Sequence, residues 1–241
     1  MVHETRSGET PRARRRAETT AAIVEAALTI VTEEGFDALT MKRLAGELGY
    51  ATGAFYRYFP SKDALLLAVQ RRVLELLAED LAEARAAIDA RLSDAPEAVA
   101  ALARIVALAQ VYETLPTRRP AHFRLLSRWL GEPEPMVSTE AAAPALPTLI
   151  ALFGSVPALL GEAAHVGALS EGDATRRGYL LWSALQGVLQ LRKLDRFGVE
   201  AFRAGPLAQE LYRALLVGWG AAGADVTDAL ARAAKVKEEI S

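Results

Sequence analysis

The stretch TGAFYRYFPSKDALL, which runs from Thr52 to Leu66, decides the fold of this chain. Aromatic residues make up 7% of the sequence, yet four of them stand within five positions here, at Phe55, Tyr56, Tyr58 and Phe59. The two phenylalanines are four residues apart, so they share a helix face and can plug a core against the preceding helix. The stretch therefore predicts a short helix that buries its phenylalanines and leaves its tyrosines near a polar surface.

The flanking sequence predicts further helices on both sides of this one. Four helices are expected in the first part of the chain, over Ala17–Glu34, Met41–Leu48, Thr52–Phe59 and Lys62–Arg91. Pro60 separates the last two. Gly49 stands in the turn between the second and the third, where a positive φ is easiest for glycine. Two helices joined by a short glycine-containing turn predict a helix-turn-helix.

The third helix has a surface suited to a DNA duplex. Its first residues are small, so it can enter the major groove without clashing, and they are placed to read bases. Tyrosine hydroxyls and a lysine ammonium at its flanks suit phosphate oxygens. Amphipathic packing beside a core explains the same pattern equally well. Residues 1–16 favour DNA binding, because five arginines against two glutamates give them a net charge of +3, on a chain whose total is −2.

The segment Ala21–Val69 resembles the DNA-binding region of the TetR family of transcriptional regulators, and the run from Phe55 to Leu66 is close to that family's most recognisable motif. Further matches are Ala26–Leu28, Gly35-Phe36, Leu39-Thr40, Leu44-Ala45 and Leu48-Gly49. The resemblance implies phosphate contacts from Thr40, Tyr56, Tyr58 and Lys62. It implies that the residues nearest the bases are Lys42, Thr52, Gly53 and Ala54. Arg43 completes the expected DNA-binding set.

One residue departs from the family pattern. Position 50 is usually a small aliphatic residue in such proteins, and here it is Tyr50. This tyrosine either changes the packing of the turn or adds a phosphate contact.

The rest of the chain is also predicted to be helical, because alanine and leucine dominate and β-branched alternation is scarce. Helices are expected over Pro96–Leu115, Pro120–Leu130, Leu146–Ala164, Glu171–Leu194, Pro206–Gly220 and Val226–Glu239. The uncharged span Ala141–Gly161 could cross a bilayer, but its three prolines favour a buried helix, so no membrane partner is expected.

The predicted fold class is all-α, with three parts. A flexible basic N-terminal arm covers residues 1–16, and a three-helix helix-turn-helix DNA-binding domain covers residues 17–62. By the family resemblance, a larger helical ligand-binding and dimerisation domain covers residues 63–241.

Two helices of the larger domain are expected to form a dimer interface, and Glu171–Leu194 resembles the family's penultimate interface helix. Small residues that allow close helix approach stand in its stripe of Leu180, Ala184, Gly187 and Leu191. A second stripe comprises Leu211, Leu215 and Trp219. Two such helices from each of two subunits would make a four-helix interface with two-fold symmetry. The alternative buries both stripes inside one subunit.

A ligand pocket is expected among the other helices. Its candidate residues, each of which also suits a core, are Tyr112, Phe123, Trp129, Phe153 and His165. The helix Leu146–Ala164, which carries no charge before Glu162, suits a largely apolar effector. Arg124 and Arg128, four residues apart, either pair with an anionic group or form a solvated face.

Enzyme functions find little support in the sequence. The absence of cysteine excludes disulfides, thiolate metal sites and cysteine nucleophiles, and it fits a cytoplasmic protein. Glu162 and His165 have the Glu-x-x-His spacing of a di-iron bundle, but the second copy that such a site needs is missing. We therefore expect no catalytic residue, no metal and no cofactor.

These observations predict a ligand-responsive transcriptional regulator that acts as a homodimer in the cytoplasm. The simplest form is a repressor that a small-molecule effector releases from a palindromic double-stranded DNA operator. The alternative is a helical small-molecule-binding protein whose DNA-binding unit is vestigial. The sequence does not name the effector, the operator or the regulated genes, and it does not separate repression from activation.

Overall fold

The computed structural model describes residues 10–131, 139, 143 and 146–240 of the 241-residue chain. Helices make up 83% of the structure and the described part contains no strand, so the predicted all-α fold is confirmed. The chain divides into two compact units. Among the described residues, the first comprises residues 10–73, 139 and 143, and the second comprises residues 74–131 and 146–240.

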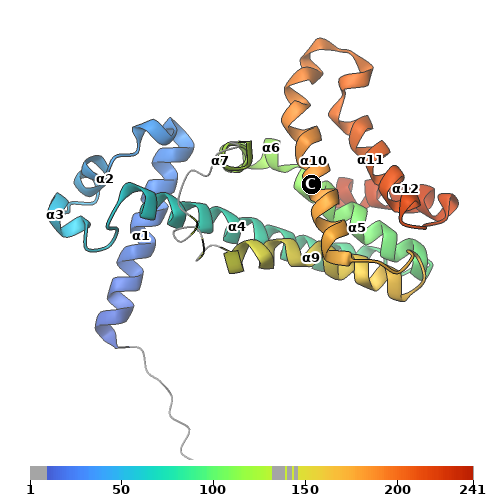
Figure 1. The fold of residues 1–241 in the computed structure, drawn as a ribbon, viewed down its shortest axis with the longest axis horizontal. Helices are drawn as coiled ribbons and strands as arrows, with labels where there is room; N and C mark the ends of the chain where they lie inside the picture. Colours follow the sequence, from blue (N-terminus) through green and yellow to red (C-terminus); the bar gives the residue numbers. More distant parts are fainter. Residues whose placement is uncertain (1–9, 132–138, 140–142, 144–145, 241) are drawn as a thin grey trace, which may run out of the picture. The chain divides into compact units, whose positions relative to one another are not determined.

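The first unit contains the helix-turn-helix (Figure 1). Its elements are α1 (Pro11–Glu34), the 3-10 helix η1 (Phe36–Ala38), α2 (Met41–Glu47), α3 (Thr52–Phe55) and the beginning of α4 (Lys62–Arg91). Helices as short as α2 and α3 do not persist alone in water. A common core holds them, and its fully buried members are Ile23, Ala27, Leu39, Leu44, Ala45, Phe55, Leu65 and Val69.

Helix α1 begins at Pro11, earlier than the predicted start at Ala17. The hydroxyl of Thr10 accepts a hydrogen bond from the backbone N–H of Ala13 at 3.3 Å, which caps the helix. Proline suits the first helical position because it has no N–H to leave unsatisfied there. Residues 11–16 of the predicted flexible arm are therefore helical, and residues 1–9 lie outside the described part of the chain.

Helix α3 is shorter than the predicted Thr52–Phe59. After Phe55 the chain tightens into a turn, in which the N–H of Arg57 donates to the carbonyl of Ala54 at 3.3 Å and the N–H of Tyr58 donates to that of Phe55 at 2.9 Å. Such i to i+3 hydrogen bonds are typical of a helix that tightens before it ends. The proline at position 60 cannot continue a helix, so the chain leaves the helical path before it.

The division between the two units falls inside α4, after Val73, and not after Lys62 as predicted. Leu65 and Val69 are fully buried and Val73 is 1% exposed, so this part of α4 completes the core of the first unit. The start of a helix marks where the chain changes direction, not where a core ends. The sequence-based boundary was therefore too early.

The second unit is a helical bundle (Figure 1). It contains the rest of α4 and then α5 (Glu97–Glu113), α6 (Leu115–Arg118), α7 (Pro120–Gly131), α9 (Leu146–His165), α10 (Ala174–Leu191), the 3-10 helices η3 (Arg192–Phe197) and η4 (Glu200–Phe202), α11 (Ala204–Gly218) and α12 (Gly223–Ile240). These helices agree closely with the ranges predicted from the sequence.

Helix α5 lies at the centre of this unit and packs chiefly against α12 and α9. Among the described residues, only the stretch Glu97–Arg118 is long and apolar enough to span a membrane, and 78% of its apolar window is buried in the bundle. Burial on this scale is typical of the core helix of a folded domain. Helix α9 overlaps the uncharged span Ala141–Gly161 that the sequence analysis identified. Its later residues Leu159 and Leu160 are buried, whereas Leu146 and Ile150 near its start are exposed.

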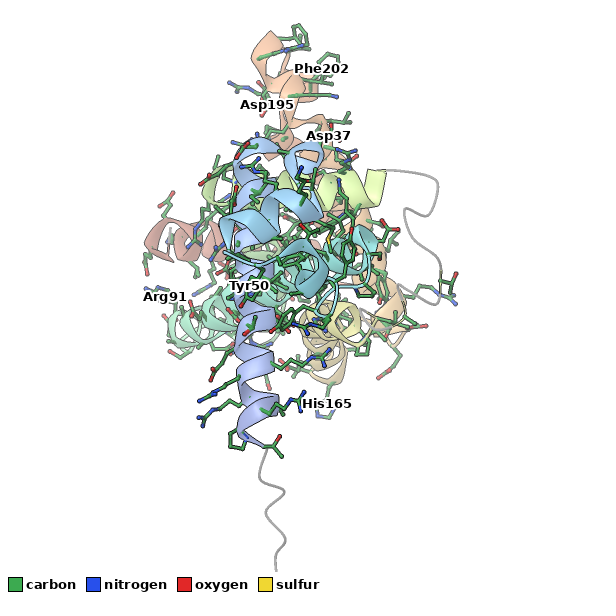
Figure 2. The ribbon with its side chains drawn as sticks, turned by 90° about the vertical axis from the view of Figure 1, so that its left-hand side faces the viewer. Asp37, Tyr50, Arg91, His165, Asp195 and Phe202 are labelled. Atoms are coloured by element: carbon green, nitrogen blue, oxygen red, sulfur yellow. The ribbon has the colours of Figure 1, made fainter. Side chains whose placement is uncertain are left out.

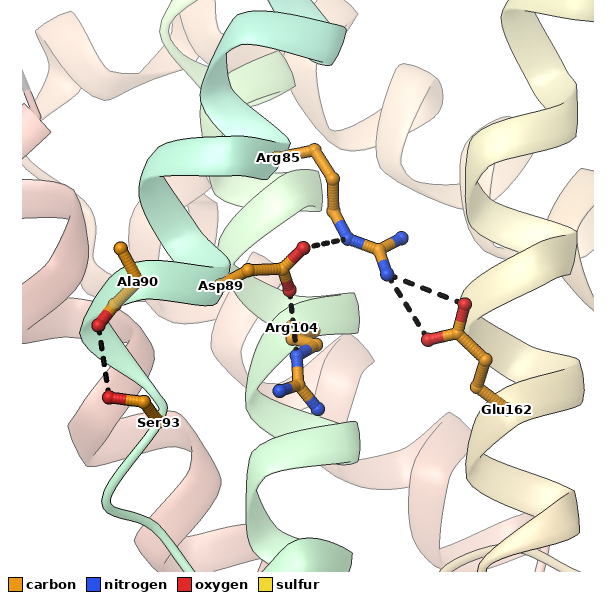
Figure 3. A network of polar contacts seen from close by, with 6 residues as sticks. All are labelled: Arg85, Asp89, Ala90, Ser93, Arg104 and Glu162. Atoms are coloured by element: carbon orange, nitrogen blue, oxygen red, sulfur yellow. Dashed lines mark hydrogen bonds and ion pairs between the residues drawn. The ribbon is translucent and has the colours of Figure 1, made fainter.

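An ion-pair network ties three helices of the second unit together (Figure 3). The carboxylate of Asp89 on α4 accepts hydrogen bonds from Arg85 Nε at 2.9 Å and from Arg104 Nε of α5 at 2.8 Å. Arg85 also donates to Glu162 of α9 at 3.1 Å. Glu162 is thus a partner of an arginine, and the described residues contain no group of three His, Asp or Glu side chains that could hold a metal ion.

We expect the substitution Asp89→Ala to lower the free energy of unfolding of this unit by about 1–2 kcal/mol, because it leaves the part-buried Arg104 without its carboxylate. Tryptophan fluorescence during urea unfolding reports this unit, since all three tryptophans lie in it. The matched control is Glu239→Ala, which breaks the exposed pair between Arg91 of α4 and Glu239 of α12 and should cost less than about 0.5 kcal/mol. Equal losses in the two variants would contradict the proposed importance of the network.

Candidate functional sites

The region around α3 has the amphipathic character that the sequence predicts. Phe55 is fully buried and Phe59 is 6% exposed, so the two phenylalanines anchor it in the core of the first unit. Tyr56 is 46% exposed, and Thr52 and Gly53 are also exposed. The buried pair therefore positions a short surface of hydroxyl groups and bare backbone for contact with another molecule.

Gly53 marks the point where that surface is most open. It does not have a positive φ, and a Cβ added to it would meet no atom within 4 Å. Neither backbone conformation nor packing within the chain therefore requires glycine here. Glycine within a helix is destabilising by about 0.5–1 kcal/mol relative to alanine, so its presence favours a role in close approach by a partner.

Tyr50, the departure from the family pattern, is a packing residue (Figure 2). Its ring centroid lies 6.4 Å from that of Phe55 and 5.9 Å from that of Tyr58, the second in an edge-on arrangement. Edge-on aromatic pairs are favourable because the positive ring edge meets the negative ring face. The extra aromatic ring thus supports Tyr58, which is half-buried, and connects the turn to α3.

Arg43 braces α2 within the unit. Its guanidinium donates to both carboxylate oxygens of Glu34 on α1, at 2.5 and 2.8 Å, and to Glu47 at 2.8 Å. The hydrogen bonds to Arg43 lower the pKa of the Glu34 carboxyl, and those from the two carboxylates raise the pKa of Arg43. Because two carboxylates already neutralise this guanidinium, the sequence-based expectation that Arg43 contacts DNA has the weakest structural support of the set.

The remaining predicted DNA-binding residues lie on the same unit. Thr40 caps α2, since its hydroxyl accepts from the backbone N–H of Arg43 at 3.1 Å. Lys42 is exposed, and Ala54 and Lys62 are half-buried. Arg16 of α1 donates to the carbonyl of Arg57 at 3.1 Å, which links the arginine-rich start of α1 to the segment after α3. Sequence reasoning missed this link because it connects residues 41 positions apart.

The second unit encloses an apolar cavity of about 40 Å³. Helices α4, α5 and α10 supply most of its wall, chiefly through Leu77, Leu81, Leu108, Tyr112, Leu181 and Trp182. A water molecule needs roughly 10–15 Å³ by this kind of measure, and a cavity of about 150 Å³ binds benzene. The cavity is thus small, and a ligand larger than a few atoms must push its walls apart.

A chain of hydrogen bonds provides the polar feature of this cavity. The hydroxyl of Tyr112 donates to Gln186 Oε1 at 2.6 Å, and Gln186 Nε2 donates to the hydroxyl of Ser127 on α7 at 3.4 Å, a long contact. Tyr112 and Gln186 are 6% and 5% exposed. Burial disfavours the charged phenolate and raises the pKa of Tyr112 to about 12.

The five predicted pocket residues do not come together. Tyr112 lines the apolar cavity, whereas Phe123 lines a separate, open depression. Trp129 is half-buried but lines neither, and the side chain of Phe153 lies outside the described residues. His165 is exposed at the last turn of α9 and lines neither of these two spaces (Figure 2). The sequence contains aromatic residues on several helices but does not say which of them face a common space.

Helix α10 supplies both cavity and surface residues. Leu181 and Leu185 are buried toward the cavity, whereas Leu180 and Leu191 of the predicted interface stripe are 49% and 50% exposed. In the same stripe, Gly187 is exposed and Ala184 is half-buried. The alternative that this stripe is internal core is therefore wrong.

The second predicted interface stripe is only partly accessible. It lies on α11 and at its end, and Leu211, Leu215 and Trp219 are all half-buried. The guanidinium of Arg177 lies 5.5 Å from the Trp219 ring and covers it. This stripe therefore combines packing inside the subunit with a limited outer surface.

Comparison with known proteins identifies the family that the helix-turn-helix resembles. Residues 23–69 match the family described as bacterial regulatory proteins, tetR family. The first unit of this chain therefore carries a segment of the TetR family. This assignment confirms the resemblance drawn from the motif Phe55–Leu66.

The TetR relatives resemble this chain most strongly in the matched segment. The transcriptional repressor DrrR1 of Streptomyces coeruleorubidus is 50% identical over 44 residues, which cover 18% of this chain and 16% of DrrR1. The uncharacterized transcriptional regulator Rv0681 of Mycobacterium tuberculosis is 29% identical over 175 residues, 70% of this chain and 67% of that protein. The chain thus spans about a sixth of DrrR1 and two thirds of Rv0681.

The fold of the whole chain also occurs in solved structures. RolR, determined in complex with resorcinol, superposes with a TM-score of 0.57 at 19% identity, over 90% of this chain and 96% of RolR. At this identity the likeness concerns the fold. It shows that the helical fold of this chain, the second unit included, has a known architecture.

Two buried tyrosines should make the stability of the chain fall at alkaline pH. Burial is the largest cause that raises the pKa of both Tyr112 and Tyr212, and the Glu113 carboxylate, which accepts from the hydroxyl of Tyr212, raises the second further. An unfolded tyrosine ionises near pH ~10, so above it the unfolded state loses protons that the folded state keeps. The free energy of unfolding should therefore fall from about pH 10 to about pH 12 for Tyr112.

Absorbance titration of tyrosinate checks this expectation. In the native protein two of the six tyrosines, Tyr112 and Tyr212, should ionise only at a raised pH. Tyr112→Phe should remove one of these two late ionisation steps. Tyr56→Phe, which removes an exposed tyrosine, should leave both late steps in place. A Tyr112→Phe titration with both late steps intact would contradict the assignment.

Proposed function

We propose that this chain is a ligand-responsive transcriptional repressor that binds a palindromic DNA operator as a homodimer in the cytoplasm. The observation that carries the proposal is the exposed face of Thr52, Gly53 and Tyr56, held in place by the buried Phe55. A short helix with a small, open first turn can enter a major groove, and the flanking hydroxyl and ammonium groups can bind phosphates. The name of DrrR1, a transcriptional repressor, supports repression over activation.

The homodimer rests on the outward stripe of α10. The stripe consists of Leu180, Ala184, Gly187 and Leu191, at spacings of four, three and four residues. Its pattern of one leucine, two small residues and one leucine is therefore the same from either end. Two antiparallel copies can therefore place small residues at the two-fold axis and leucine against leucine on either side. A two-fold pair presents two recognition helices to half-sites about one DNA turn apart.

The effector of this proposal is a small, largely apolar molecule that enters the cavity beside Tyr112. The resorcinol complex of RolR supports a ligand of this kind in the same fold. Because the cavity is small, an entering ligand must displace its walls, among them Leu77 and Leu81 of α4. Helix α4 continues into the DNA-binding unit, so such a displacement can change operator affinity. Coupling between two sites is reciprocal and typically about 1–3 kcal/mol.

DNA binding is tested by fluorescence anisotropy with duplexes from the region upstream of the chain's own gene. We expect Lys62→Ala and Tyr56→Phe each to weaken binding about five- to tenfold, because each removes one phosphate contact, and we expect a steep loss of affinity with salt. Gly53→Ala should weaken binding while leaving stability unchanged or higher. The matched control is Lys235→Ala, which removes an exposed lysine of α12.

The competing function, a ligand-binding protein with a vestigial DNA-binding unit, gives a different result. It predicts no tight duplex among the upstream fragments and no difference between the four variants. A wild-type chain that binds small molecules but responds to none of these substitutions would therefore overturn the repressor proposal.

The homodimer has its own test. We expect Leu180→Arg to shift the chain from dimer to monomer in analytical ultracentrifugation, because it places a charge against the leucine of the second subunit in an apolar contact. Leu146→Arg is the matched control, since Leu146 is 53% exposed but lies on α9, away from the stripe. Dimers that survive Leu180→Arg, or that dissociate equally in both variants, would rule out this interface.

A further inference from the structure

The second unit contains an open depression of about 570 Å³ beside the end of α10. Its walls come from α7 and from the junction of α10 with η3. Three of its lining residues are cationic, namely Arg124, Arg192 and Lys193, and no carboxylate is among the described residues that line it. The volume lies within the usual range of about 300–1,000 Å³ for small-molecule sites.

The rest of the lining is partly apolar. Phe123 is buried to 9% exposure and Leu189 to 5%, so they form a fixed hydrophobic wall. Ser127 and Gln190 add neutral hydrogen-bonding groups. A depression lined by three cations and by a buried phenylalanine and leucine is suited to an amphipathic anion.

We propose that this depression is a second ligand site, which binds small amphipathic anions that carry a carboxylate or a phosphate. The anionic group lies between Arg192, Lys193 and Arg124, where guanidinium groups can form paired, charge-assisted hydrogen bonds. The apolar part of the ligand lies on Phe123 and Leu189. The site differs from the apolar cavity in its walls and in the charge of its ligand.

Ser127 connects the two sites. Its side chain lines the depression and accepts the hydrogen bond from Gln186, and Gln186 in turn accepts from Tyr112, which lines the apolar cavity. An anion in the depression competes for the hydroxyl of Ser127. If the hydroxyl turns to the anion, the buried amide of Gln186 loses its acceptor and must find another hydrogen-bond partner. Occupation of the depression therefore alters the polar wall of the cavity. This second step rests on the proposed effector role of the cavity.

Binding is measured by isothermal titration calorimetry on the full chain without DNA, with octanoate and octyl phosphate as anionic probes and 1-octanol as the neutral one. We expect both anions to bind at least about tenfold more tightly than octanol. The octanoate and octyl phosphate arms tell whether carboxylate or phosphate is preferred. The salt dependence of anion binding should be marked.

Variants locate the site. Arg192→Gln and Lys193→Gln should each weaken anion binding about tenfold and leave octanol binding unchanged. The control Arg176→Gln removes an arginine of α10, whose side chain is 87% exposed and outside the depression, and should bind like the wild type. Equal binding of octanol and octanoate, or equal effects of control and site variants, would overturn the anion site. Since no DNA is present, that failure would leave the proposed repressor function untouched.

The connection through Ser127 is tested with toluene as a probe of the apolar cavity. Saturating octanoate should change the dissociation constant of toluene about fivefold or more in the wild type, and Ser127→Ala should abolish this change while octanoate still binds. An unchanged effect in Ser127→Ala would overturn the connection.

Discussion

The burial of Phe55 is the constraint on which the functional reading of this chain depends. Helix α3 has four residues, too few to be stable by helix propensity, so its place is fixed by tertiary packing alone. Phe55 supplies that packing from inside, Tyr50 supports it from the side, and the capped helix α2 leads into the turn before it. Only because these contacts hold the backbone can Gly53 and the exposed Tyr56 keep a defined direction. A recognition surface built from so few residues needs a scaffold that leaves it no alternative conformation.

Helix α10 of the second unit contributes to two different surfaces, one inside the subunit and one outside it. One face carries Leu181, Leu185 and Gln186, which border the cavity and its hydrogen-bond chain. The opposite face carries Leu180 and Leu191 in contact with solvent. Residues on a helix turn by 100° at each step, so neighbours in sequence such as Leu180 and Leu181 necessarily serve different surfaces. A ligand that moves this helix from inside would therefore also move the surface proposed to meet the second subunit.

The sequence predicted the helices well and the cavity poorly, for physical reasons. Helix limits depend on local signals, such as the cap at Thr40 and the proline at position 60, which can be read from neighbouring residues. Whether Tyr112 and His165 share a space depends on how separate helices pack, and no local signal reports that. The same limitation hid the ion pairs of Arg43: its partner Glu47 lies at the i+4 spacing, but Glu34 is brought close only by the packing of α1 against α2. The early boundary at Lys62 had the same origin, because a helix limit was taken as a limit of the core.

The pairing of Arg43 also changes how charge at the DNA-binding unit should be understood. A count of arginines treats every cation as available to phosphates, whereas the guanidinium of Arg43 is already neutralised by two carboxylates. Exposed cations of this unit include Arg12 and Arg15, in the first turns of α1, and Lys42 of α2. The face of α3 itself offers hydroxyls and backbone, which bind only at close range and in the correct geometry. Because the chain as a whole has a net charge of −2, long-range attraction to DNA is weak, and tight binding must come from fit to a particular site.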